Sequence, residues 1–248
     1  MGVLLTVSYN GANYCGWQDQ RNGKSVQEAL SKAVGSALAI DSEFTMLGAS
    51  RTDAGVHALG QRAHVITKRP VKVPVEKIPL VLNNDLPDDI RVTAATFVPD
   101  NFHPINNTIS KTYRYTICNT RYNNPIMRNY SSHIRIPLDV SKMASATKHI
   151  IGEHDFAAFC SSGSIVKSTI RTVYTLDINQ NADMVEITIS GNGFLYNMVR
   201  IIAGTLVNVG IGKIVPDDVK AIIESLDRTR AGKTMPPQGL TLLEIFYG

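Results

Sequence analysis

The chain has few cysteines and lacks the patterns that mark metal sites. Its three cysteines, Cys15, Cys118 and Cys160, are scattered along 248 residues and form no C-x-x-C pair. A disulfide scaffold is therefore excluded, and a reducing, cytoplasmic location is expected. None of the six histidines stands in an H-E-x-x-H pattern or at ligand spacing from a cysteine, so we expect no metal site.

Motifs for nucleotide cofactors are also missing. Gly232-Lys233-Thr234 imitates the end of a phosphate-binding P-loop, but Asp227 stands where that motif requires glycine. Residues 191–193 are Gly-Asn-Gly, but Tyr196 stands where a dinucleotide fingerprint requires a third glycine. The nucleophile-elbow pattern G-x-S-x-G is absent. We therefore expect either an enzyme without a cofactor or a binding protein.

No apolar run is uninterrupted enough for a membrane span. The longest one, residues 194–211, contains Asn197, Arg200 and Asn208, a polar content that a membrane helix rarely carries. The run therefore predicts a helix of a globular protein, and we expect no membrane partner. The net charge of +4 permits a polyanionic partner without requiring one.

The pattern of elements predicts an α+β fold of two similar halves, residues 1–104 and 105–248, because strand, helix and paired strands occur on both sides of residue 105. Ser25 and Glu28 form an S-x-x-E capping box at the start of the first helix. The expected strands are residues 3–8, 44–49, 63–67, 90–97, 111–118, 173–179, 184–190 and 240–247. The expected helices are residues 26–38, 138–151, 195–209 and 216–226, and residues 50–60 form a loop.

The segment 48–61 is the most informative part of the chain. It is polar, contains several glycines and lies between two apolar strands, a position in which loops commonly hold reactive groups. Asp53 stands before an Ala54-Gly55 turn, where backbone donors could hold its carboxylate. From the residues alone, an Asx turn in which Asp53 only caps the loop is the favoured explanation.

This segment strongly resembles the catalytic motif of the tRNA pseudouridine synthase A family. Four further segments resemble the family's other motifs in the same order along nearly the whole chain. These are Tyr9-Asn10-Gly11 with Gly16-Trp17-Gln18, Phe102-His103 with Lys111-Thr112-Tyr113-Arg114-Tyr115, residues 194–200, and Pro236-Pro237-Gln238-Gly239-Leu240. A chance match of five ordered motifs is improbable.

The resemblance implies a fold, a reaction and a partner. The family converts uridine at positions 38, 39 and 40 of the tRNA anticodon stem-loop to pseudouridine, without a cofactor and as a homodimer. Its fold has two similar halves that share a continuous, mainly antiparallel sheet, with helices on one face and a basic cleft between the halves. The succession of strand, helix and paired strands that occurs on both sides of residue 105 agrees with that description.

The resemblance also assigns roles to residues of this chain. Asp53 matches the family's nucleophile, which attacks either the ribose or the uracil ring, and Arg200 matches the cation that keeps this carboxylate ionised. Tyr113 matches the tyrosine that lies against the target base, with Lys111 on the same face of its strand. Arg51 and His57 flank the nucleophile, and both are expected to bind substrate, as is Lys111. Without the resemblance, Tyr113 could be a core residue, Arg200 a surface residue and His57 a structural one.

Two departures from the family pattern leave alternatives open. Ser50 stands where the family usually has glycine, and Pro104-Ile105-Asn106-Asn107 replaces a segment that usually contains an arginine. The alternatives to the tRNA enzyme are a catalytically weak tRNA-binding module and a related uridine isomerase that acts on another RNA. The intact Arg51-Thr52-Asp53 segment and Tyr113 favour the enzyme.

Overall fold

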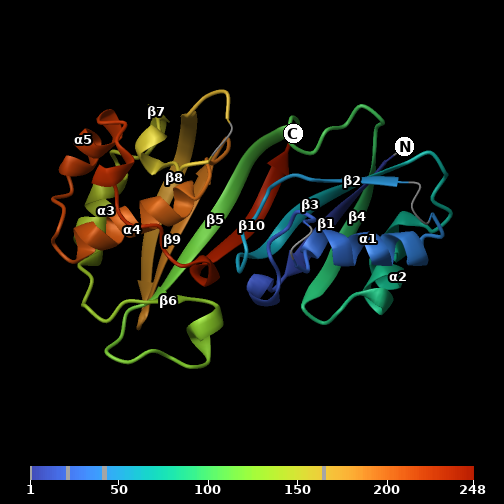
Figure 1. The fold of residues 1–248 in the computed structure, drawn as a ribbon, viewed down its shortest axis with the longest axis horizontal. Helices are drawn as coiled ribbons and strands as arrows, with labels where there is room; N and C mark the ends of the chain where they lie inside the picture. The colour runs from blue at the N-terminus through green and yellow to red at the C-terminus, as the bar shows by residue number, and fades with distance from the viewer. Residues whose placement is uncertain (1, 21–22, 41–43, 164–165) are drawn as a thin grey trace. The chain divides into compact units, whose positions relative to one another are not determined.

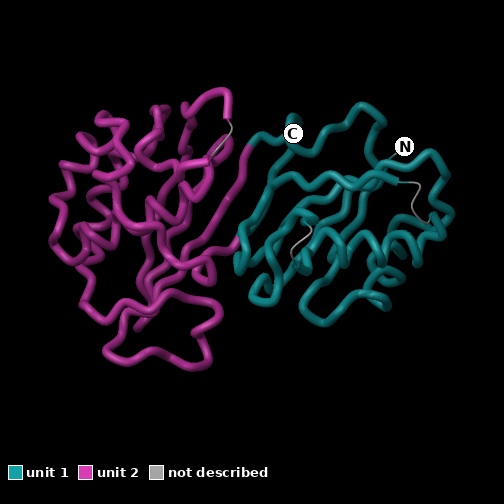
Figure 2. The backbone as a smooth tube through the Cα atoms, viewed as in Figure 1, with its two compact units in different colours: residues 1–109, 242–248 teal, residues 110–241 magenta. Residues whose placement is uncertain are grey.

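The computed structural model describes residues 2–20, 23–40, 44–163 and 166–248. The chain forms two compact units, residues 1–109 with 242–248 (unit 1) and residues 110–241 (unit 2), which Figure 2 draws in different colours. The sequence analysis divided the chain at residue 105 and placed the last strand in the second half. In the structure, that strand belongs to unit 1 from residue 242 onward.

Unit 1 is built on an antiparallel sheet. Its strands follow the order β4 (Ile90–Val98), β1 (Gly2–Tyr9), β3 (His57–Thr67) and β10 (Leu240–Tyr247), and β2 (Phe44–Gly48) also pairs with β3. The helices α1 (Val26–Ala37) and α2 (Ile78–Asp85) lie side by side against this sheet (Figure 1). Two short 3-10 helices, η1 (Gly11–Asn13) and η2 (Val75–Lys77), complete the unit.

The start of α1 confirms the predicted capping box. The Ser25 hydroxyl accepts a hydrogen bond from the backbone N–H of Glu28 at 3.0 Å, which satisfies one of the open donors of the first turn. The residues spaced four apart that predicted the helix, Val26, Leu30 and Val34, are all buried. The cap and the apolar face therefore both come from local sequence.

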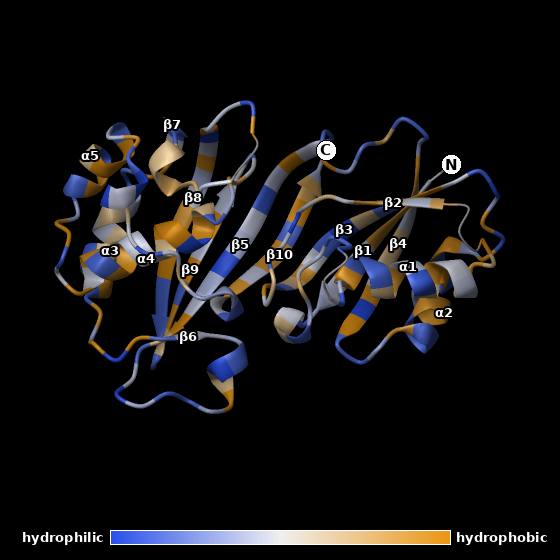
Figure 3. Cartoon of the chain, in the orientation of Figure 1, coloured by the Kyte–Doolittle hydropathy of each residue, from blue (hydrophilic) through white to orange (hydrophobic). Residues whose placement is uncertain are grey.

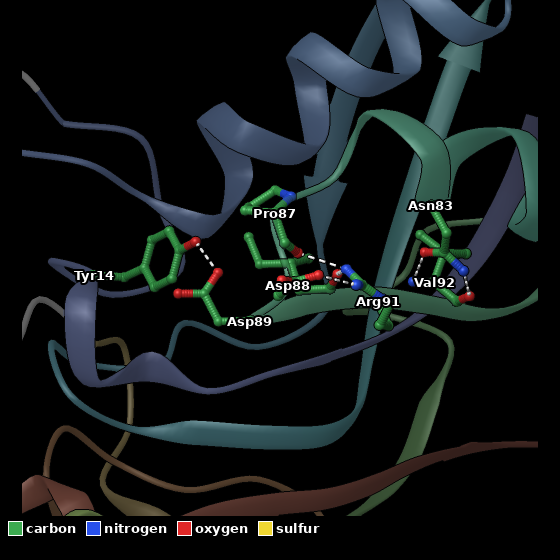
Figure 4. A network of polar contacts seen from close by, with 8 residues as sticks. Tyr14, Asn83, Pro87, Asp88, Asp89, Arg91 and Val92 are labelled. Carbon is green, nitrogen blue, oxygen red and sulfur yellow. Dashed lines mark hydrogen bonds and ion pairs between the residues drawn. The ribbon is translucent and has the colours of Figure 1, made fainter.

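A network of polar contacts ties the chain after β1 to the segment before β4 (Figure 4). The Tyr14 hydroxyl donates to Asp89 at 2.5 Å, and burial, followed by this neighbouring carboxylate, raises the pKa of Tyr14. The Asn83 carboxamide of α2 makes two hydrogen bonds with the backbone of Val92, at 2.8 and 2.9 Å. These contacts fix α2 and the Tyr14 segment on β4.

Unit 2 is built on a second set of antiparallel strands. Their order is β5 (Thr108–Cys118), β9 (Met184–Gly191), β8 (Ile170–Asn181) and β7 (Gly152–Asp155), and β6 (Ser132–His133) pairs in parallel with β5. In Figure 3, the middle of β5 shows hydrophilic bands separated by nearly neutral ones, and the strand includes the predicted residues 111–118. The predicted strands of residues 173–179 and 184–190 are confirmed as β8 and β9, which pair as an antiparallel hairpin.

The remaining elements of unit 2 are helical. They are α3 (Val140–Thr147), α4 (Met198–Gly210), α5 (Asp218–Glu224), and the 3-10 helices η3 (Met127–Asn129), η4 (Ala157–Phe159), η5 (Arg228–Arg230) and η6 (Pro237–Gly239). Together with unit 1, they confirm the predicted α+β class with a mainly antiparallel sheet. Among the described residues, no helix is long and apolar enough to cross a membrane.

Some element boundaries differ from the sequence predictions. The strand β3 begins at His57, six residues before the predicted start, so His57 is not a loop residue. The helix α4 begins at Met198 instead of residue 195, because Asn197 has a left-handed backbone that a right-handed helix cannot contain. The helix α3 ends at Thr147 instead of residue 151, and α2 lies where no helix was predicted.

Candidate active site

The loop of residues 49–56, which we call the Asp53 loop, connects β2 to β3 in unit 1. Asp53 is half-buried, and its carbonyl accepts a hydrogen bond from the Val56 N–H at 3.1 Å. Gly55, the third residue of this four-residue turn, has a φ of 79°, which a type II turn requires and which glycine adopts without strain. Asp53 therefore occupies the first position of a tight, closed turn.

Residues from the end of β1 and the following segment hold the Asp53 loop through Thr52. The hydroxyls of Tyr9 and Thr52 are 2.7 Å apart, and the Trp17 N–H donates to the Thr52 carbonyl at 3.0 Å. Gly16 has a φ of 106°, and a Cβ added there would lie 2.6 Å from the Thr52 carbonyl oxygen. Only glycine fits this position, which explains why a Gly-Trp pair accompanies the loop.

Gln61 holds the first part of the loop and is a residue to which the sequence analysis gave no role. Its side chain is 0% exposed. The carboxamide oxygen accepts from the Ser50 N–H at 3.2 Å, and the carboxamide nitrogen donates to the Ser50 carbonyl at 2.7 Å. Gln61 is the last residue of the motif segment 48–61, and this position is the one sequence signal that could have marked it.

His57 lies in a different environment from the one expected for a substrate-binding residue. Its ring is 5% exposed, and its Nδ1 accepts a hydrogen bond from the Gly11 N–H at 3.1 Å. The accepting nitrogen carries no proton, so the ring packs β3 against η1 in the neutral state. This contact agrees with the structural role that the sequence analysis left open for His57, and its substrate-binding role stays a prediction.

Arg51 is the exposed charged residue of the loop. Within the described part of the chain, its side chain has neither a hydrogen bond nor an ion pair. A guanidinium on a braced loop presents several donors in a fixed fork, which suits contacts to phosphate or to a base edge.

In unit 2, Tyr113 and Lys111 lie on one face of β5. Tyr113 is 7% exposed and pairs with Ile189 of β9, and its ring meets Phe194 edge to face at 5.3 Å. Lys111 pairs with Gly191. Burial, followed by the nearby Arg171 guanidinium, lowers the pKa of Lys111 to about 8. This strand end therefore combines an aromatic pair with two neighbouring cations.

Arg200 lies in the first turn of α4, and hydrogen bonds hold its guanidinium. Its Nε donates to the Met235 carbonyl at 2.7 Å, and a terminal nitrogen donates to the Asn197 side-chain oxygen at 2.6 Å. Tyr115 of β5 donates its hydroxyl to the adjacent Pro236 carbonyl at 2.7 Å. Arg200 and Tyr115 together fix residues 235–236, just before the motif's Pro-Gln-Gly segment.

The rest of α4 is buried on nearly all sides. A Cβ added to Gly204 would lie 2.0 Å from the Lys233 carbonyl oxygen. The neighbouring Gly232 N–H donates to the Thr205 hydroxyl at 2.8 Å. Glycine at position 204 therefore allows the backbone of residues 232–233 to approach α4 closely.

The described residues include no group of three or more histidine, cysteine, aspartate or glutamate side chains that could hold a metal ion. The predicted site residues thus fall into two sets. Unit 1 contains Arg51, Asp53 and His57 on or beside one loop, and unit 2 contains Lys111, Tyr113 and Arg200 on β5 and α4.

Comparison with known proteins identifies the family. A family model described as tRNA pseudouridine synthase matches residues 5–105 and 146–248. The chain is 51% identical over 245 residues to the tRNA pseudouridine synthase A of Thermoanaerobacter sp. (strain X514), with 99% of both chains covered. The chain belongs to the tRNA pseudouridine synthase A family. It is therefore an isomerase that modifies tRNA.

Other members of this family are similar over the same length. The identity is 48% over 246 residues to tRNA pseudouridine synthase A of Ruminiclostridium cellulolyticum, with 99% of both chains covered. It is 42% over 247 residues to that of Bacillus velezensis, covering 100% of this chain and 99% of the relative. Among solved structures, a chain of a Cbf5-Nop10-Gar1 complex matches with a TM-score of 0.40 and 11% identity, over 97% of this chain and 48% of that chain, a likeness too low to carry an argument.

Proposed function

We propose that the protein converts uridines 38, 39 and 40 of the tRNA anticodon stem-loop to pseudouridine, with Asp53 as the nucleophile. The observation that carries this proposal is the similarity to tRNA pseudouridine synthases A over 99% of the chain. The loop that contains Asp53 is also held in place by hydrogen bonds to Thr52 and Ser50. The positions within tRNA come from the family resemblance. Asp53 is half-buried on this loop, and covalent catalysis needs an anion that is shielded in part from water.

The reaction is an internal rearrangement of the nucleoside. The bond between C1′ of the ribose and N1 of the uracil breaks, the base turns, and C1′ forms a bond to C5. The proton on C5 leaves, and N1 takes up a proton, so atoms and electrons balance without a redox partner or phosphate energy. A carboxylate that forms a covalent intermediate divides this exchange into two easier steps.

The other site residues have roles in binding and charge. Arg200 supplies the cation that favours the ionised form of the nucleophile. The Tyr113 ring contacts the target base, and its hydroxyl takes part in proton transfer. Arg51 and Lys111 contact the RNA beside the uridine, which must leave the helical stack at a cost of about a few kcal/mol.

Tritium release tests this function. tRNA that carries tritium on C5 of uridine loses the label as C5 becomes the glycosidic carbon, so released tritium counts turnovers. We expect release from anticodon stem-loops with uridine at position 38, 39 or 40, and none from a matched stem-loop with cytidine at all three. A folded protein that binds tRNA and releases no tritium from any of them would contradict the proposal.

Binding of tRNA should depend strongly on salt. Residues 101–138 contain five lysines and arginines and no aspartate or glutamate. Three of these cations, Arg121, Arg128 and Arg135, are exposed, whereas Arg114 forms an ion pair with Glu186 at 3.5 Å. A filter-binding series should show log affinity falling against log salt with a slope of about −0.7 to −0.9 per phosphate contacted. An affinity that does not change with salt would show that phosphates do not hold the tRNA.

The family resemblance also supports a homodimer in the cytoplasm. The three unpaired cysteines agree with a reducing compartment. Sedimentation equilibrium of the purified protein tests the dimer, and a single monomeric species at assay concentration would contradict it.

A further inference from the structure

Asn197, the residue before α4, has an unusual backbone. Its φ and ψ are 61° and 7°, in the left-handed region. Residues other than glycine rarely adopt this region, and asparagine is among the few that do. An asparagine directly before a helix normally accepts a hydrogen bond from an N–H of the first turn. Asn197 makes no such capping bond, so its side chain is available for other hydrogen bonds.

The carboxamide of Asn197 lies between two side chains. Its oxygen accepts from a terminal nitrogen of Arg200 at 2.6 Å, and its nitrogen donates to the Ser161 hydroxyl at 3.0 Å. The backbone N–H of Ser161 in turn donates to the carbonyl of Tyr196 at 3.1 Å. The guanidinium has only donors, so the carboxamide must direct its oxygen toward Arg200, and the orientation of the amide is fixed by chemistry.

Arg200 is therefore held by acceptors at two of its nitrogens. The Asn197 oxygen accepts at the terminal nitrogen, and the Met235 carbonyl accepts at Nε. Two fixed acceptors at different corners of a planar group determine the orientation of its plane. The Met235 N–H also donates to the Arg200 carbonyl at 3.2 Å, so the segment that supplies the second acceptor is attached to the same residue.

We propose that Asn197 is a positioning residue for Arg200. Its backbone is left-handed and its side chain does not cap the helix. Instead, the side chain bonds Ser161 and orients the Arg200 guanidinium for the reaction. This inference rests on the proposed function, in which Arg200 is the cation that acts on the nucleophile. Strained backbone that persists beside a reacting group commonly serves such preorganisation.

The test is Asn197→Gly, which separates orientation of Arg200 from support of the fold. Glycine adopts the left-handed backbone more readily than asparagine, so the relief of backbone strain should offset part of the stability that is lost with the side-chain hydrogen bonds, and the variant should stay folded. It removes both side-chain hydrogen bonds, so single-turnover tritium release should fall by about 10- to 100-fold while the KM for tRNA changes by less than about threefold. A merely structural asparagine predicts unchanged turnover.

Ala182→Gly is the matched control, because Ala182 also has a positive φ, 49°, in the turn between β8 and β9. It should leave turnover unchanged. Ser161→Ala is the second variant. It removes only the outer anchor and keeps the backbone of Asn197, so we expect a smaller loss of turnover, about two- to tenfold. Turnover equal to the parent in folded Asn197→Gly and folded Ser161→Ala would overturn the proposal.

A double-mutant cycle completes the test. If Asn197 acts through Arg200, then Asn197→Gly should cause no further loss in the Arg200→Ala background, measured with enzyme in excess over tRNA. A further loss of the full 10- to 100-fold would show that Asn197 acts independently and would overturn the proposal. Failure of the proposed function is seen separately, because it appears as a parent protein that releases no tritium or as Arg200→Ala with parental turnover.

Discussion

Asp53→Asn should reduce pseudouridine formation by about four orders of magnitude or more, because it removes the covalent route of the reaction. Asparagine has nearly the same shape as aspartate and can still occupy the first position of the turn, in which the Val56 N–H binds the residue's backbone carbonyl at 3.1 Å. The bonds that hold Thr52 and Ser50 do not involve the Asp53 side chain. The loss should therefore come from chemistry and not from the fold.

Three measurements on one preparation distinguish these outcomes. Tritium release gives turnover, filter binding gives the affinity for tRNA, and circular dichroism gives the fold. Affinity should change little, because a single loop carboxylate repels rather than attracts an anionic RNA. Asp217→Asn is a suitable control, because Asp217 is an exposed residue that bonds His149 and Lys148 at 2.9 and 3.0 Å. It should keep parental turnover.

A folded Asp53→Asn protein that releases tritium at the parental rate would refute the role of Asp53. A parent and variant that both bind tRNA and both release nothing would instead favour a binding module. The experiment therefore separates a wrong residue from a wrong function.

The parts of the fold that could be predicted from sequence are those fixed by local signals. The cap at Ser25 and the last strand, residues 240–247, were predicted at the residues where the structure has them. An S-x-x-E box and an apolar strand pattern act within a few residues, so neither depends on the rest of the molecule.

The parts that could not be predicted depend on contacts between distant segments. The early start of β3 was missed because Gly60 suggests a loop, yet a Cβ there would lie 2.4 Å from the Leu243 carbonyl oxygen. Glycine stands in this strand because β10 approaches it closely. The short strands β6 and β7 are likewise too short to carry a sequence pattern.

The candidate site shows the same division. The motif resemblance located Asp53, Tyr113 and Arg200, but it did not distinguish the exposed Arg51 from the buried His57. It also gave no role to Gln61 or to the Asn197 side chain. Both act through carboxamide groups that bond residues 11 positions and 3 positions away, and nothing in the local sequence marks these partners.

Arg200→Ala should reduce turnover by about 100- to 1000-fold, the usual size of the loss when a preorganised group that stabilises charge is removed. Without the guanidinium, the acidic limb of the pH–rate profile should also move to higher pH, because a neighbouring cation favours the ionised carboxylate. Arg200→Lys should recover only part of the activity, since an ammonium keeps the charge but cannot reproduce a planar fork that bonds Met235 and Asn197 at 2.7 and 2.6 Å.

Stability must be measured beside this activity, because Arg200→Ala leaves the Met235 and Asn197 oxygens without their donors, at a cost of about 1–3 kcal/mol for each one that stays buried. Arg91→Ala is the matched control: like Arg200, Arg91 donates to two oxygens of nearby residues, here the carbonyls of Pro87 and Ile90 at 2.6 and 2.7 Å, and it lies outside the proposed site. Turnover is measured at a temperature at which thermal unfolding shows that both variants are fully folded. A loss of turnover in Arg200→Ala under that condition identifies a chemical role. Parental single-turnover rates in folded Arg200→Ala would rule out Arg200 as the partner of Asp53. The cation that keeps Asp53 ionised would then have to be sought at or beside Lys111, which lies on β5.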